Sequence, residues 1–309
     1  MKTLREITET LERIEHAKVS DSELLDLFRQ LPPLALHVFE VGRDIRILRC
    51  RTHGGEFPNW KSELEISYVS NPELADYGRA SLKGHSAFYG CIGRSSDEFE
   101  EARMLSIHET NRIIHDPTFE YEEEYAVVGN WNVLHPLNVV AIVQAEQLHG
   151  KNELLHAEFQ SYLAALDATP IDKEGCIAFT TFLAGEFLKE VDRSSPENYK
   201  ITAAFSHYVM ERGLDGVAYP SARAEGASNT YNITLKPRAI DNNCKLKAVY
   251  GYRLIKEDPK SLIPIPFLGD TEVVGKFQWI DPGYMPRPDF IIGQLRKQRL
   301  LQKQAEAKG

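Results

Sequence analysis

Apolar side chains near the N-terminus recur at the spacing of an amphipathic helix. The intervals of three or four residues over residues 4–16 place four of them on one face: Leu4, Ile7, Leu11 and Ile14. In the following stretch VSDSELLDLFRQLPP, polar residues at 20–22 can cap a second helix, which two prolines end. Because the apolar stripe must be buried and about 35 residues are too few for a stable domain, we expect residues 1–35 to pack against the rest of the chain.

Segments with strand-like composition lie on both sides of a helical middle. DIRILRCRT, HSAFYGCIG, EEYAVVGNWNVLHPL and CKLKAVYGYRLI are rich in β-branched and aromatic residues, and DGVAYPSARAEGASNTYNITLKP has the same character. SSDEFEEARMLSIHETNRI begins with capping residues and acids, as a helix does. Residues 138–166, 177–192 and 198–212 also favour helix. This order predicts an α+β chain with a mixed β-sheet.

The same pattern predicts three parts of the chain. Residues 1–40 form a helical N-terminal extension, and residues 41–256 form the main domain, with a helical insertion at about 138–212. Residues 257–309 form a C-terminal extension that is rich in proline and ends in a basic helix.

Composition and charge narrow the function classes. The net charge of −9 argues against broad nucleic-acid binding, because phosphate contacts need a basic surface. No apolar run approaches the roughly 20 residues that span a bilayer, and the charged N-terminus lacks the apolar region of a secretory signal. The four cysteines form no CxxC pair. We therefore expect a cytoplasmic protein with reduced thiols and no membrane association.

Common catalytic motifs are absent. The chain contains no GxGxxG, GxxxxGK[ST], HExxH or GxSxG. In HETNRIIH the second histidine follows the first by seven residues, whereas a zinc-binding helix needs them one turn apart. We therefore expect no metal site.

Two sets of polar residues stand out against this background. Arg49 and Arg51 fall on one face of a strand, where we expect them to meet solvent or an anionic ligand, since buried charge is costly. Arg79 precedes Tyr89 by ten residues, and glycines surround both. Each residue alone has an ordinary structural explanation, but a nucleotide pocket uses both an arginine and an aromatic ring.

Four blocks lie in order over roughly residues 45–255: ILRCR, ISYVSNPELADYGRASLKGHSAFYG, SIHET and GLDGVAYPSARAEGASNTYNITLKP. In this order they resemble the RES-domain family, the toxin component of RES–Xre toxin–antitoxin modules. The resemblance implies an ADP-ribosyltransferase-like mixed sheet that binds NAD as its substrate. It also implies catalytic roles for Arg79, Tyr89, Glu109 and Ser221, and NAD-binding roles for Arg49, Arg51 and Asn232.

The chain departs from the family pattern at two places. Ser81 stands where the family usually has asparagine, two residues after its arginine. The family glutamate follows the tyrosine by about eleven residues in compact members, which is Glu100 here. We prefer Glu109, which lies late in the expected helix, because Glu100 and Glu101 are explained as a solvated acidic first turn.

The residue types suit NAD chemistry on independent grounds. Arginine binds a pyrophosphate through charged hydrogen bonds worth about 1.5–3 kcal/mol each, and a tyrosine ring stacks on the cationic nicotinamide. Breaking the nicotinamide–ribose bond builds positive charge on the ribose, which a carboxylate such as Glu109 stabilises. Ser221 can bond the ribose or the carboxamide, in a turn that Pro220 helps to fix.

These observations favour an NAD-consuming enzyme that acts by hydrolysis or phosphorolysis, as a toxin or defence effector. One alternative transfers ADP-ribose to a protein or nucleotide. Another is a non-catalytic RES-like scaffold that binds a nucleotide or a partner. The resemblance implies an Xre-like antitoxin that blocks the cleft, and the oligomeric state stays open.

Overall fold

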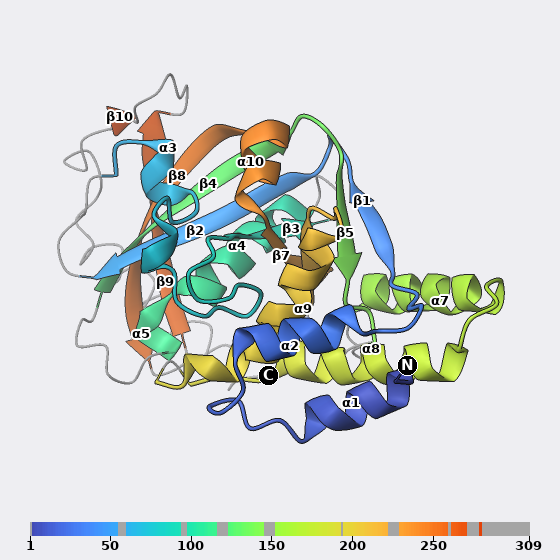
Figure 1. Cartoon of the computed structure of the whole chain (residues 1–309). Helices are drawn as coiled ribbons and strands as arrows, with labels where there is room; N and C mark the ends of the chain where they lie inside the picture. Colours follow the sequence, from blue (N-terminus) through green and yellow to red (C-terminus); the bar gives the residue numbers. More distant parts are fainter. Residues whose placement is uncertain are drawn as a thin grey trace, which may run out of the picture.

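The computed structural model describes residues 2–54, 60–93, 98–115, 123–144, 152–192, 194–221, 229–258, 261–270 and 278–279. Their strands form a mixed sheet in the order β1-β5-β6-β7-β3-β2-β4-β8-β9-β10. The strands are β1 Val38–Val41, β2 Arg46–Gly54, β3 Phe88–Gly93, β4 Glu123–Val133, β5 Leu137–Ala141, β6 Gly216–Tyr219, β7 Thr230–Leu235, β8 Cys244–Asp258, β9 Ser261–Asp270 and β10 Gln278–Trp279. The α+β class and the mixed sheet are therefore confirmed (Figure 1).

The longest strand pairs lie in the β2–β4–β8 half of the sheet. β2 pairs with β4 from Arg46 and Asn132 to Gly54 and Glu124, and β4 continues into an antiparallel pairing with β8. The opposite edge holds β5 and β6, which are parallel, with Val139 beside Gly216. Parallel neighbours need a long crossover, and the helical insertion supplies it here.

The first residues of the expected insertion form a strand rather than a helix. Leu137–Ala141 pairs with β1 on one side and with β6 on the other, so the helical interpretation of residues 138–141 is wrong. A short apolar run such as LNVVA fits a buried strand as well as a buried helix, and here long-range pairing decides.

The helices occupy both faces of the sheet. They are α1 Leu4–Glu12, α2 Asp21–Arg29, α3 Glu63–Ile66, α4 Phe99–Thr110, α5 Arg112–His115, α7 Glu153–Asp167, α8 Lys173–Leu188, α9 Lys200–Glu211 and α10 Pro237–Asn243, with 3₁₀ turns η1 Pro72–Leu74 and η3 Pro196–Tyr199. α4 packs on β2 and β3, where Leu105 joins Leu48 and Cys91 in a small core. The larger core lies between the sheet and the other helices.

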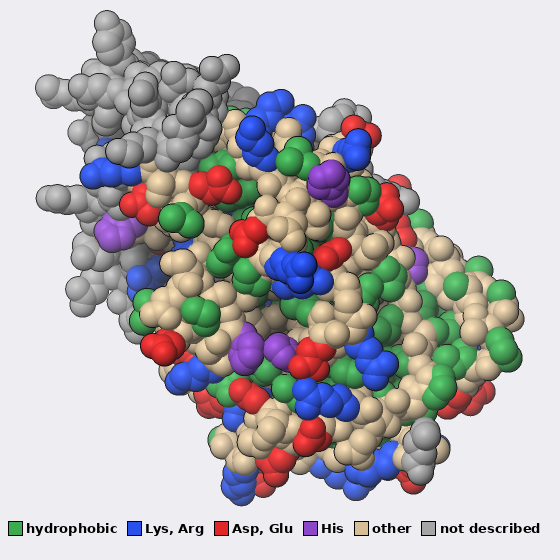
Figure 2. All heavy atoms as spheres, turned by 45° about the horizontal axis from the view of Figure 1, so that its top comes forward, with side chains coloured by type: hydrophobic (Ala, Val, Ile, Leu, Met, Phe, Trp, Pro, Cys, Tyr) green, Lys and Arg blue, Asp and Glu red, His purple; other side chains and the backbone are tan. Residues whose placement is uncertain are grey.

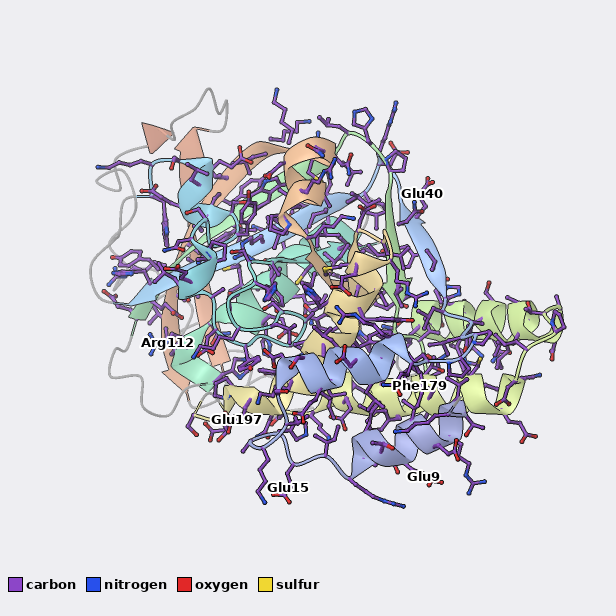
Figure 3. All side chains as sticks on the ribbon, in the orientation of Figure 1. Glu9, Glu15, Glu40, Arg112, Phe179 and Glu197 are labelled. Atoms are coloured by element: carbon purple, nitrogen blue, oxygen red, sulfur yellow. The ribbon has the colours of Figure 1, made fainter. Side chains whose placement is uncertain are left out.

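The N-terminal helices pack against the insertion, as expected. Reciprocal side-chain caps at Thr3 and Ser20 begin α1 and α2. α1 lies on α8 and α2 lies on α9, where the Phe28 and Phe205 ring centroids are 5.8 Å apart. Figure 3 shows Phe179 of α8 among these helices, whereas Glu9 points outward. The expected boundary between residues 40 and 41 falls inside β1.

The sheet continues past the end of the expected domain. β9 pairs antiparallel with β8, so part of the segment after residue 256 belongs to the sheet. The expected basic terminal helix lies outside the described residues. On the face that Figure 2 shows, acidic and basic side chains are interspersed rather than gathered by sign. Among the described residues, no helix has the length and apolar character needed to cross a membrane.

Candidate functional site

A cavity of about 210 Å³ opens where β2, β3, β6 and β7 meet α4 and η3. Its lining includes five of the residues that the sequence singles out: Arg49, Arg79, Tyr89, Glu109 and Asn232. Ser221 lies beside the cavity and bonds to Glu109, whereas Arg51 is not part of the lining. The structure thus brings together side chains from four distant segments of the chain.

Glu109 is fixed by two uncharged donors. The Ser221 hydroxyl donates to Glu109 Oε1 at 2.5 Å, and the Asn232 amide Nδ2 donates to the same oxygen at 2.9 Å. Ser221 is 4% exposed and Asn232 is 8% exposed, so the carboxylate is held from its buried side. Hydrogen bonds from these two neutral donors orient the carboxylate.

Strand register places these donors. Asn232 of β7 pairs with Cys91 of β3 and with Tyr219 of β6, so all three side chains share one sheet face. The Cys91 thiol donates to Asn232 Oδ1 at 3.2 Å, which leaves Nδ2 directed at Glu109. Burial, followed by the nearby Glu109 charge, raises the pKa of the Cys91 thiol, so that thiol stays a donor.

The two alternative glutamates lie elsewhere on α4. Glu100 is 64% exposed and pairs with Arg103 one turn away, and Glu101 is exposed to solvent. Neither lines the cavity. Of the three glutamates considered from the sequence, Glu109 alone lines it.

Tyr89 presents its ring to the cavity and fixes a turn with its hydroxyl. The Ala80 backbone N–H donates to Tyr89 Oη at 3.1 Å, and Ser81 Oγ is 2.8 Å from the same oxygen. A Cβ atom at Gly78 would lie 2.4 Å from Tyr89 Oη, so only glycine allows this approach. Ser81, which stands where the RES-domain pattern has asparagine, bonds to Tyr89. Burial raises the pKa of Tyr89.

Arg79 combines a structural contact with free donors. Its Nη1 donates to the Phe187 carbonyl at 2.5 Å and to the Lys189 carbonyl at 2.8 Å, at the end of α8. A cation at a helix C-terminus is favourable. The guanidinium also lies 5.0 Å from the Tyr199 ring centroid. Within the described residues, Nε and Nη2 have no hydrogen-bond partner, so a ligand can use them.

Arg49 and Arg51 bind backbone carbonyls. Arg49, 8% exposed, donates to the carbonyls of Ile66, Ser67 and Tyr89 at 2.9, 3.2 and 2.6 Å. Arg51 Nη2 donates to the Ser67 carbonyl at 2.6 Å. The two arginines share a strand face; Arg49 is buried and lines the cavity, whereas Arg51 is half-buried, and their binding of an anion stays a prediction.

The burial of Arg49 carries an electrostatic cost. Burial, and then the Arg51 charge, lowers the pKa of Arg49 to about 9, so it remains charged at neutral pH. Its guanidinium lies 5.1 Å from the centroid of the Phe88 ring. The carbonyls and the ring compensate for part of the lost hydration.

Two lining tyrosines were not among the residues chosen from the sequence. Tyr199 comes from η3 in the helical insertion, and nothing in its local sequence marks it. Tyr219 is the last residue of β6 and precedes Ser221 by two residues. Its place in VAYPS, beside a residue already assigned to the site, could have identified it from the sequence. Burial, followed by the nearby Tyr89, raises the pKa of Tyr219. The insertion thus contributes a wall of the cavity.

The described residues contain no group of three or more His, Cys, Asp and Glu side chains that could hold a metal ion. The polar side chains at the candidate site include one carboxylate, its two neutral donors, two arginines and three tyrosines, all in described segments. Comparison with protein-family models gave no match to this chain, and comparison with curated proteins gave none either.

Proposed function

We propose that this protein binds NAD and cleaves the bond between nicotinamide and ribose. One observation carries the proposal: the Glu109 carboxylate lines the cavity and accepts hydrogen bonds there from the Ser221 hydroxyl and the Asn232 amide. A carboxylate in this setting suits a reaction in which positive charge develops on the substrate. The resemblance of the surrounding blocks to the RES-domain family supports the same chemistry.

Glu109 acts on the ribose in this proposal. As the glycosidic bond breaks, positive charge builds on the ribose C1′ and ring oxygen, and the fixed carboxylate stabilises it. Because Ser221 and Asn232 fix the carboxylate before the substrate arrives, little reorganisation is needed during the reaction. Electrons of the broken bond leave with neutral nicotinamide, and water or phosphate then attacks C1′.

In this proposal, Tyr89 binds the nicotinamide of NAD and Arg79 binds its pyrophosphate. The Tyr89 ring stacks on the nicotinamide cation while its hydroxyl stays bonded to the turn of residues 78–81, here called the Arg79 turn. Arg79 offers Nε and Nη2 to the pyrophosphate. Arg49 shapes the cavity floor, since most of its donors serve carbonyls.

The size of the cavity fits part of the substrate. Small-molecule sites usually enclose about 300–1,000 Å³, and this cavity measures about 210 Å³. It therefore suits the nicotinamide–ribose portion of NAD, with the adenosine portion outside it.

Purified protein incubated with NAD tests the proposal. We expect nicotinamide release, with ADP-ribose as the co-product in phosphate-free buffer, or a phosphorylated ADP-ribose when phosphate is the acceptor. If radiolabelled NAD is used, label that appears on an added protein or nucleotide would instead indicate ADP-ribosyl transfer. Binding of NAD without release of nicotinamide would favour a scaffold, and no binding would reject the NAD site.

A further inference from the structure

The Arg79 turn is held from the core side by a small set of backbone hydrogen bonds. Gly78 and Ser81 form an isolated antiparallel bridge, with Gly78 N–H donating to the Ser81 carbonyl at 2.9 Å and Ser81 N–H donating back at 3.3 Å. Ala80 N–H donates to Tyr89 Oη. These bonds shape the turn, and further contacts lie outside it: Arg79 Nη1 bonds the Phe187 and Lys189 carbonyls, and Tyr77 bonds the N-terminal extension.

The outer anchor comes from the N-terminal extension. Tyr77, which directly precedes the turn, donates its hydroxyl to the Asp21 carboxylate, at 2.9 Å from Oδ1 and 3.0 Å from Oδ2. Asp21 is the first residue of α2. A hydrogen bond to a charged group contributes about twice as much as a neutral one. Burial and this hydrogen bond raise the pKa of Tyr77 to about 12, so the hydroxyl remains a donor at physiological pH.

Lys200 of the helical insertion binds the segment that leads into α2. Its ammonium group donates to the carbonyls of His16 and Val19 at 3.0 and 2.8 Å, just before α2 begins. It also lies 5.6 Å from the centroid of the Tyr77 ring. The next residue back along the chain, Tyr199, stacks on Arg79 itself. The N-terminal extension, the insertion and the Arg79 turn therefore meet in one contact network.

We infer that Tyr77 and Asp21 are positioning residues, through which the N-terminal helices hold Arg79 over the cavity. The role assigned to Arg79 rests on the proposed function, whereas the anchoring of its turn does not. Loss of the Tyr77 hydroxyl frees the turn from α2 but leaves Arg79, Glu109 and the cavity lining chemically intact. NAD binding should then weaken more than turnover falls.

Amide hydrogen exchange without NAD tests the anchoring. Tyr77→Phe should speed exchange at Gly78, Ala80 and Ser81 by about tenfold, the effect of losing one charged hydrogen bond. Tyr68→Phe is the matched control, because Tyr68 donates in the same way to Asp241 on α10. Asp21→Asn keeps an oxygen acceptor but loses the charge, so its exchange should lie between that of the wild type and Tyr77→Phe, whereas Asp21→Ala should match Tyr77→Phe. Equal exchange in Tyr77→Phe and the wild type overturns the inference.

Steady-state kinetics separate this inference from the proposed function. With active wild-type protein, Tyr77→Phe should raise KM for NAD by about tenfold and change kcat less than threefold. Equal losses in kcat and kcat/KM would contradict a positioning role. If the wild type neither binds nor cleaves NAD, the proposed function fails, and the exchange experiment still decides whether Tyr77 anchors the turn.

Discussion

Glu109 differs from Glu100 and Glu101 of the same helix because its carboxylate accepts hydrogen bonds from Ser221 and Asn232 at the cavity. Glu109→Gln keeps the side-chain size and its contacts with two neutral donors but removes the negative charge. Because that charge acts on the transition state, we expect turnover to fall by about 10²–10³ while NAD affinity changes little. Nicotinamide release and calorimetric NAD binding measure the two effects.

Glu101→Gln is the control for this variant, since Glu101 lies exposed on the same helix. It should retain wild-type turnover. Near wild-type turnover in Glu109→Gln would remove the carboxylate from the mechanism.

Substitution of Arg79 should lower both the affinity for NAD and the free energy of unfolding. Arg79→Ala removes the donors available to the pyrophosphate and also the contact with two carbonyls at the end of α8. We expect NAD affinity to fall by about tenfold or more, and the free energy of unfolding to fall by about 1–3 kcal/mol. Calorimetry and urea denaturation measure these losses.

Arg79→Lys refines this prediction. Lysine keeps the charge but lacks the planar fork, so both losses should be smaller than in Arg79→Ala. Unchanged NAD affinity in Arg79→Ala would show that Arg79 is solely a cap of α8.

At the scale of elements, the N-terminal helices belong to the core rather than to an accessory arm. Phe28 of α2 is fully buried against Phe205 and Tyr208 of α9. Phe28→Ala should lower the free energy of unfolding by about 3–5 kcal/mol, as large-to-small core substitutions do. Leu64→Ala, at a side chain with 73% exposure, should change it by less than about 0.5 kcal/mol.

Urea denaturation of both variants provides the comparison. A loss below about 1 kcal/mol for Phe28→Ala would mean that α2 contributes little to the fold.

The sequence predicted the elements whose signals are local. The spacing of Leu4, Ile7 and Leu11 specified α1, because periodicity reports a buried face directly. The strand Leu137–Ala141 was missed because its pairing partners lie in β1 and β6, far away in the chain. The position in the helix, together with the place where the RES-domain pattern has its glutamate, favoured Glu109 over Glu100, and neither ground depends on distant partners.

Other features of the site depend on long-range packing. The carbonyls that bind Arg49 belong to Ile66, Ser67 and Tyr89, and strand alternation gives no information about them. Tyr199 reaches the cavity only because the insertion folds back on the Arg79 turn. The sequence can identify such residue types, but it cannot locate their partners.

For the whole molecule, buried acids control stability at alkaline pH. Burial raises the pKa of Cys50 and of Cys244 from 9.0 to about 12. It raises those of Tyr77 and Tyr162 from 10.0 to about 12. Each group binds its proton more tightly in the folded chain, so its contribution is complete below pH 9 or 10 and is lost toward pH 12.

The lowered pKa of Arg49 acts in the opposite direction, because the unfolded chain binds that proton more tightly above pH 9. Among the described residues, the cysteines and tyrosines whose pKa is raised outnumber the arginines whose pKa is lowered, so the urea midpoint should be level from pH 7 to 9 and fall from pH 9 to 11. Tyr77→Phe should flatten the fall above pH 10. A midpoint that rises over this range would contradict the assignment of these buried acids.

The packing of α1 and α2 on α8 and α9 also sets an order of events during synthesis. The ribosome completes α1 at Glu12, but α8, which covers its apolar face, begins only at Lys173. At about 5–20 residues per second, that face waits roughly 8–30 s for its partner. Throughout this interval the nascent chain carries the exposed leucine and isoleucine side chains of α1. Newly made protein should therefore depend on chaperones that shield apolar segments, and the Arg79 turn should gain its outer anchor only late in translation.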